Sequence, residues 1–195
     1  MSPGDIAVRK PVWVAMSDLF LDTDVRLNYS YVARTLAQSP FTLAELKRIF
    51  DKEVAPAVGA NLMCVAGEWA GFDEEWLVSK ILRRFDNITP SPSSKPAGTD
   101  WKAVAVLVER LRSLDPVDWP RRVRLWEQLL KLFMDLDPQP GPFEESPTEL
   151  EAVWRDEMWP SYGCSVEMYR KYSLLRYPSA VEIEVSWTRI RKALS

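Results

Sequence analysis

The sequence contains no histidine among its 195 residues. That absence excludes Ser-His and Cys-His catalysis, and it excludes every metal site that needs an imidazole ligand. Only two cysteines occur, Cys64 and Cys164, and their wide spacing matches no metal or redox motif. We interpret them as core thiols in a reducing compartment. The remaining chemistry is that of carboxylate, Lys, Tyr, Ser or Cys side chains acting without imidazole.

Long apolar runs are also missing, since none approaches the roughly 20 residues that a membrane span needs. The N-terminus shows no export signal, because Asp18 interrupts the short apolar stretch that begins at Val12. The net charge of −3, from 25 basic and 28 acidic residues, argues against non-specific nucleic-acid binding. We therefore expect a cytoplasmic protein without cofactor, metal, membrane contact or nucleic-acid partner.

What the sequence does contain is helical periodicity. Apolar residues recur every three or four positions, as in a helix with one buried face. Capping boxes begin at Thr42, Ser146 and Ser179. Residues 181–187 also alternate like a strand, but a lone strand has no partner, so we predict a helix there. The fold class is predicted to be all-α, with apolar faces Trp13–Met16–Phe20, Leu77–Ile81–Phe85 and Val123–Trp126–Leu130–Phe133.

The two halves of the chain resemble one another. Trp13 to Asp24 matches Trp126 to Asp137 in spacing and type, and Ser39-Pro40, Glu53, Pro56 and Gly59 find counterparts in Ser146-Pro147, Glu157, Pro160 and Gly163. We predict two related helical modules, produced by an internal duplication and packed into one compact helical array. The sequence has nine tryptophans, and we expect several of them to lie at the seams between helices. The predicted boundaries are an N-terminal module 1–86, a Pro/Ser-rich linker 87–99 and a C-terminal module 100–195.

The most unusual string runs from Asn61 to Asp73. Small residues flank Glu68-Trp69 and would let the backbone turn and present that pair. One interpretation is a recognition loop in which Trp69 anchors a partner, with Glu68 and Asp73 beside it. The other interpretation places Trp69 in the core, with Gly67 and Gly71 shaping the entry into a helix that Asp73 begins. The second half of the chain lacks this string.

Paired carboxylates offer a second set of candidate residues. Asp22 with Asp24, and Asp135 with Asp137, would serve as turn or cap residues in the structural interpretation. In the functional interpretation they contact a partner, or two acids converge about 5–9 Å apart for hydrolysis. None has the glycine-containing loop of a calcium site. Basic clusters, such as Arg121-Arg122, would instead suit a regulatory adaptor or a DNA-associated protein.

The strings Trp13 to Asp24 and Asn61 to Trp76 resemble a small bacterial domain family of unknown function. The signature is Val-Ala-Gly-Glu-Trp-Ala-Gly-Phe-Asp followed by Trp76, and the resemblance covers roughly the first 85 residues. The family implies no activity. Small, acidic bacterial proteins without an export signal include immunity proteins against interbacterial toxins, and we extend that class to this chain by analogy.

The function expected from these observations is binding rather than catalysis. We predict a non-enzymatic protein, an immunity protein whose partner is a cognate toxin or effector domain. No catalytic residue is predicted, and the alternatives are a carboxylate-based hydrolase or lyase and a regulatory adaptor. The predicted partner-binding residues are Glu68, Trp69, Asp73, Asp22, Asp24, Asp135 and Asp137.

Overall fold

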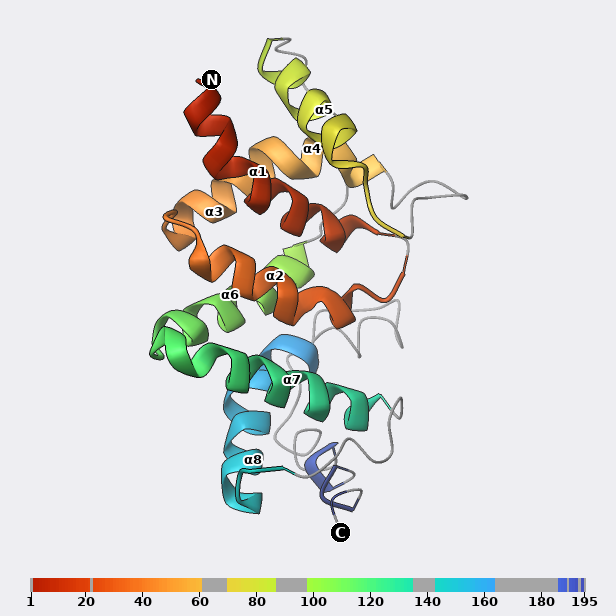
Figure 1. Ribbon diagram of the computed structural model, residues 1–195. Coiled ribbons are helices and arrows are strands. Elements are labelled where there is room, and N and C mark those ends of the chain that lie inside the picture. Colours follow the sequence, from red (N-terminus) through yellow and green to blue (C-terminus); the bar gives the residue numbers. More distant parts are fainter. Residues whose placement is uncertain are drawn as a thin grey trace. The chain divides into compact units, whose positions relative to one another are not determined.

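Every regular element in the described part of the computed structural model is a helix (Figure 1). No strand occurs among these residues, so the all-α prediction is confirmed there. The segment 61–69, Cys64 and Cys164 lie outside the described residues. The structure describes residues 2–21, 23–60, 70–86, 98–134, 143–163, 186–188, 190–192 and 194.

The contacts within the chain form two compact units, residues 1–101 and 102–195. The helix α6 (Gly98–Arg112) runs across the boundary between them. Residues 87–97 of the predicted linker 87–99 lie outside the described part, while Gly98 already begins α6. The predicted division into 1–86, 87–99 and 100–195 therefore stays a prediction.

In the first unit, α1 (Pro3–Ser17) packs against α2, α5 and the π-helical turn η3 (Figure 1). Capping boxes begin α1 at Ser2 and α3 at Thr42, because each hydroxyl accepts a backbone N–H three residues on. The other elements are η1 (Asp18–Phe20), η2 (Val25–Asn28), α2 (Tyr29–Gln38), α3 (Leu43–Ile49), η3 (Phe50–Val54), α4 (Ala55–Val58) and α5 (Glu74–Asp86).

In the second unit, α7 (Trp119–Phe133) packs against the π-helical segment η6 (Trp154–Gly163). A third capping box begins α8 (Pro147–Val153) at Ser146, as the sequence predicts. The short helix η5 (Pro116–Asp118) leads into α7. Residues 186–188 and 190–192 are helical, and there the predicted helix is confirmed; the strand-like residues 181–185 lie outside the described part.

The predicted pairing of Ser39 with Ser146 joins two different structural positions. Ser39 is the C-cap of α2, whereas Ser146 begins a helix. Thr42 begins the corresponding helix in the first unit, and a constant spacing then relates Leu46 to Leu150 and Glu53 to Glu157. The dipeptide Ser-Pro misled the alignment because Ser suits both ends of a helix boundary.

In both units the helix widens into a π-helical turn at the sequence Glu-x-x-Pro, which is Glu53 to Pro56 in the first unit and Glu157 to Pro160 in the second. Pro56 and Pro160 lack an N–H and crowd the carbonyl four residues earlier, so the ordinary helical ladder cannot pass through them. In the first unit the backbone N–H of Ala55 instead bonds the carbonyl of Phe50, five residues back. The widened turn sets the direction in which Glu53 leaves the backbone, and the same holds for Glu157 in η6.

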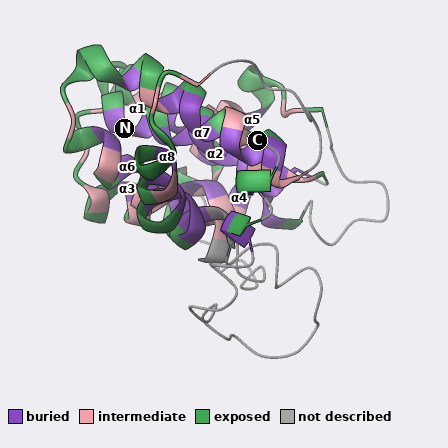
Figure 2. Ribbon diagram, turned by 90° about the horizontal axis from the view of Figure 1, so that it is seen from below, coloured by how far each residue is buried: buried purple, intermediate pink, exposed green. Residues whose placement is uncertain are grey.

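The buried residues, purple in Figure 2, include most of the described tryptophans. Phe85, predicted on the buried face with Leu77 and Ile81, is instead 46% exposed. It stands in the last turn of α5, and periodicity cannot reveal whether a neighbour covers the end of a helix. Trp76 is also exposed, at 41%. The buried tryptophans among the described residues are Trp13, Trp101, Trp119, Trp126, Trp154, Trp159 and Trp187.

Candidate functional site

Two of the seven predicted partner-binding residues fall within the described part of the chain, and both act as helix caps. Asp73 precedes α5, and its Oδ1 accepts the backbone N–H of Trp76 at 2.8 Å. Gly71, two residues earlier, has φ of +132°, a conformation that favours glycine. Both features match the structural interpretation of this turn. Glu68, Trp69, Asp22, Asp135 and Asp137 lie outside the described residues.

Asp24 is the N-cap of η2 and is held by Arg26. Its Oδ1 accepts the backbone N–H of Arg26 at 3.2 Å and the guanidinium Nε at 2.7 Å. Burial acts to raise the pKa of Asp24, but the hydrogen bonds and charge of Arg26 outweigh it and hold the pKa below its ordinary value. Asp24 is therefore an ionised, paired carboxylate.

The exposed side of α5 carries a surface that the sequence interpretation missed. The rings of Phe72 and Trp76 stack with centroids 5.8 Å apart and planes within 7°. The Nζ of Lys80 lies 4.3 Å from the Trp76 ring centroid, within cation–π distance. We call these three residues the aromatic face of α5. Their spacing of four residues, just outside the buried stripe of Leu77 and Ile81, was the available signal.

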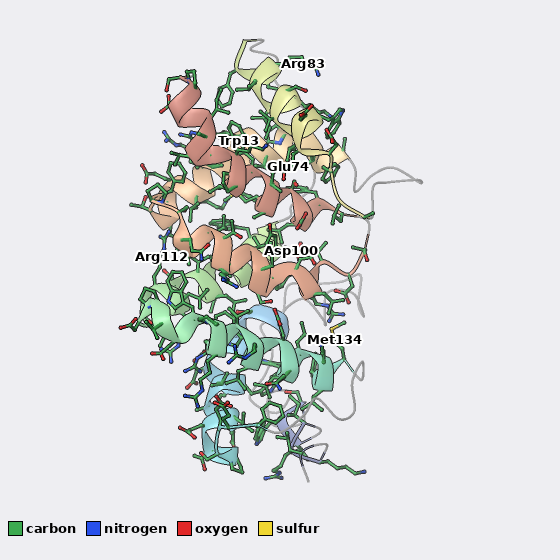
Figure 3. The ribbon with its side chains drawn as sticks, in the orientation of Figure 1. Trp13, Glu74, Arg83, Asp100, Arg112 and Met134 are labelled. Atoms are coloured by element: carbon green, nitrogen blue, oxygen red, sulfur yellow. The ribbon has the colours of Figure 1, made fainter. Side chains whose placement is uncertain are left out.

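Charges surround this aromatic face. Acidic residues occupy the first turn of α5 and basic residues its last turn, which suits the helix dipole. Glu74 and Arg83 mark these two ends in Figure 3. Glu74 also pairs with Lys10 of α1 at 2.7 Å, which ties the start of α5 to the neighbouring helix. An aromatic surface on a fixed helix, with both signs of charge beside it, can bind another protein.

Behind the surface of the first unit lies a buried carboxylate, Glu53, which is 7% exposed. Its Oε2 accepts the indole N–H of Trp13 at 2.7 Å, and its Oε1 accepts Arg9 at 2.7 Å. Trp13 and Arg9 are four residues apart on α1, and Figure 3 labels Trp13 there. Both carboxylate oxygens are used, so Glu53 serves the structure.

Glu157 is the matching carboxylate of the second unit and is 6% exposed. Its Oε2 accepts the indole N–H of Trp126 at 2.9 Å. Arg122, four residues before Trp126, reaches Oε1 at 3.2 Å, and Arg110 from α6 reaches the same oxygen at 2.8 Å. The sequence paired Trp13 with Trp126 and Glu53 with Glu157. It missed the arginines, whose only signal was the shared four-residue spacing before each tryptophan.

The described residues contain no group of three or more Cys, Asp or Glu side chains placed to hold a metal ion. Within the same part of the chain, every helix is too short or too polar to span a bilayer.

Comparison with known proteins places the chain by family alone. No curated protein and no solved structure matches it. One family model matches residues 7–109, a range that includes Glu53, the segment 61–69 and the aromatic face of α5. The match covers more than half of the 195 residues. The chain therefore belongs to the family described as domain of unknown function DUF7079.

Proposed function

We propose that this chain is a non-enzymatic protein that binds another protein through the aromatic face of α5. The observation that carries the proposal is the stack of Phe72 on Trp76, in which Trp76 is 41% exposed and Phe72 is partly buried. Seven other tryptophans in the described part of the chain are buried, so exposure of this one departs from the pattern of the molecule. Exposed, ordered tryptophan is a common anchor of protein interfaces.

The ordering of the face supports its use in binding. Trp76 is held by Phe72 on one turn and by Lys80 on the next, so little side-chain entropy is left to lose when a partner binds. The segment with Glu68 and Trp69 directly precedes this face in the chain. We propose that those two residues extend the same surface, with Asp73 at its edge.

We further propose that the partner is a toxin and that the chain is an immunity protein acting in the cytoplasm. The excess of acid, 28 residues against 25 basic ones, would favour encounter with a basic partner. Asp22, Asp24, Asp135 and Asp137 would contribute to that attraction in this proposal. The signature from Val65 to Asp73 would then mark the binding region of the family.

We also propose that the two halves are copies of one helical module. The matched contacts Arg9–Glu53–Trp13 and Arg122–Glu157–Trp126 support this relation. It predicts that equivalent substitutions in the two halves have effects of the same kind.

Affinity purification from the native host tests the function. The intact chain is compared with Trp76→Ala and with Phe85→Ala, a control on the same helix that removes an exposed ring outside the aromatic face. We expect the intact chain and F85A to retain a stoichiometric protein partner and W76A to lose it. The captured protein, expressed alone, should arrest growth, and co-expression of this chain should restore it.

Each outcome bears on a separate part of the proposal. Recovery of no stoichiometric protein partner contradicts the binding function. Full retention by W76A places the interface elsewhere. A partner that is harmless when expressed alone rules out toxin neutralisation and leaves protein binding standing.

A further inference from the structure

A cavity of about 470 Å³ lies in the second unit, beside the buried carboxylate Glu157. The segments that line it are the end of α6, the helix η5, the start of α7, α8 and the start of η6. Its volume is within the range of small-molecule sites. Three arginines line it, Arg110, Arg121 and Arg122, together with five carboxylates.

Two of these arginines share a single carboxylate. Arg110 gives its Nε to Glu157 at 2.8 Å, and Arg122 gives one terminal nitrogen to the same group at 3.2 Å. Two guanidinium groups thus share one carboxylate, in a lining that also contains Glu145 and Glu149. Each guanidinium has five N–H donors, so both retain donors beyond those used on Glu157. The floor of the cavity can accept one further anionic group.

The corresponding site of the first unit, around Glu53, has different neighbours. There Glu53 has one arginine, and the guanidinium of Arg9 lies 5.2 Å from the ring centroid of Phe41. The residue that corresponds to Phe41, one position before the capping box, is Glu145 in the second unit. Glu145 turns instead to Arg121, at 2.9 Å. The aromatic cover of the first site is therefore replaced by an ion pair in the second.

Carboxylates without a partner lie at the edge of the cavity. Asp118, at the start of α7, makes no capping hydrogen bond, and Asp156 is exposed on η6. Neither carboxylate has a partner among the residues that the structure describes. With five carboxylates against three arginines in the lining, a multiply charged anion would be repelled. A ligand with one anionic and one cationic group could pair with the arginines through the first and with Asp118 and Asp156 through the second.

We propose that this cavity binds a small zwitterion such as a free α-amino acid. Its carboxylate contacts Arg110 and Arg122, and its ammonium group contacts Asp118 and Asp156. The site is independent of the aromatic face of α5, which belongs to the other unit. The class of ligand follows from the two unequal sets of charges and from the size of the cavity.

Nuclear magnetic resonance of the full chain tests this with an internal control. The indole N–H signal of Trp126 reports on Glu157, and that of Trp13 reports on the matched site in the first unit. We expect an α-amino acid from a panel of the standard set, added to about 10 mM, to shift the Trp126 signal and leave Trp13 unmoved. Its N-acetyl and amide derivatives, which lack one charge each, should bind at least about tenfold more weakly.

Two variants and one control locate the site. Arg110→Gln leaves Glu157 with one arginine and one tryptophan, the complement that Glu53 has, so the fold should survive. Glu145→Phe copies Phe41 and should fill the cavity. Both should lower affinity at least about tenfold. Arg124→Gln, on the exposed side of α7 and outside the lining, should leave affinity unchanged.

The proposal fails if no amino acid in the panel shifts the Trp126 signal. It also fails if binding survives in both R110Q and E145F, which would put the site elsewhere. Equal affinity for acetate, phosphate or the singly charged derivatives would overturn the zwitterion as the ligand class.

Discussion

Glu53 and Glu157 are buried at matched positions of the two units, yet their surroundings differ in one respect that matters. Each accepts an indole N–H and an arginine from the helix packed against it. Among the described residues, Glu157 has a second arginine and Glu53 has one, while the guanidinium of Arg9 lies over the ring of Phe41. The same triad therefore has an aromatic ring beside its arginine in the first unit and borders a cavity in the second.

The two triads have the same hydrogen-bond pattern, but their surroundings give them different roles. Burying a carboxylate is unfavourable unless its charge and its lone pairs are satisfied, and Arg9 with Trp13 suffices for that. A second arginine brings further N–H donors to the same carboxylate. Arg110, with 39% of its side chain exposed, lines the cavity.

Removing either carboxylate should have the largest effect on stability. Glu53→Ala and Glu157→Ala each leave a buried indole N–H and at least one arginine unpaired, so each should lower the free energy of unfolding by about 3–5 kcal/mol. Urea unfolding followed by circular dichroism measures this. Glu109→Ala, an exposed change on α6, should stay within about 0.5 kcal/mol. Similar values for E53A and E109A would show that the buried triad contributes no net stability.

Removing an arginine should affect the stability of the two sites differently. Arg9→Gln removes the arginine that pairs with Glu53 among the described residues and should lower stability by about 2–3 kcal/mol. Arg110→Gln leaves Arg122 in place, and its partly exposed pair should account for less than about 1 kcal/mol. The same denaturation series gives both numbers. Equal losses would mean that Arg110 contributes as much to the stability of its site as Arg9 does.

Asp18 distinguishes the ends of the two matched helices. Burial raises the pKa of Asp18 at the end of α1 to about 6, whereas α7 has Lys131 at the corresponding position. The folded state therefore holds the Asp18 proton more tightly than the unfolded state, whose pKa is near 3.8. The ionised carboxylate opposes folding above pH 6, and this penalty disappears below about pH 4.

Asp18→Asn should accordingly raise stability at pH 7.5 by about 1 kcal/mol, after allowance for solvent screening of a partly exposed group. At pH 3.5 the variant and the intact chain should be equally stable. Urea unfolding at the two pH values checks the sign. A gain that persists unchanged at pH 3.5 would assign the effect to something other than ionisation.

The smallest effect concerns the capping boxes that begin α3 and α8. Thr42→Ala and Ser146→Ala each remove a hydroxyl that accepts one backbone N–H, so each should lower stability by about 1 kcal/mol. The two losses should agree if the halves are built alike. Thr35→Ala, whose hydroxyl bonds a carbonyl within α2, serves as the neutral control. A marked difference between the two caps would break the correspondence at this point.

Local signals in the sequence predicted much of this arrangement. Thr42–Glu45 and Ser146–Glu149 were identified as helix starts because a capping box is made by residues close in the chain. The equivalence of Glu53 with Glu157 also followed from spacing. Arg110 could not be found this way, since it reaches Glu157 from 47 residues away on another helix. The prediction that Phe85 is buried is wrong, because periodicity identifies the apolar face of a helix but not whether another element covers it.

By itself, the sequence determined the helical class and the helix starts at Thr42 and Ser146, and its spacing paired Trp13 with Trp126 and Glu53 with Glu157. These depend on backbone hydrogen bonding and on the period of apolar residues, which neighbours in the chain establish. Tertiary structure decided which carboxylates are neutralised and which exposed ring stands on α5. It also decided that Glu157 borders a cavity while Arg9 lies beneath Phe41. Those outcomes depend on burial and on charges brought together from distant helices, which no local pattern records.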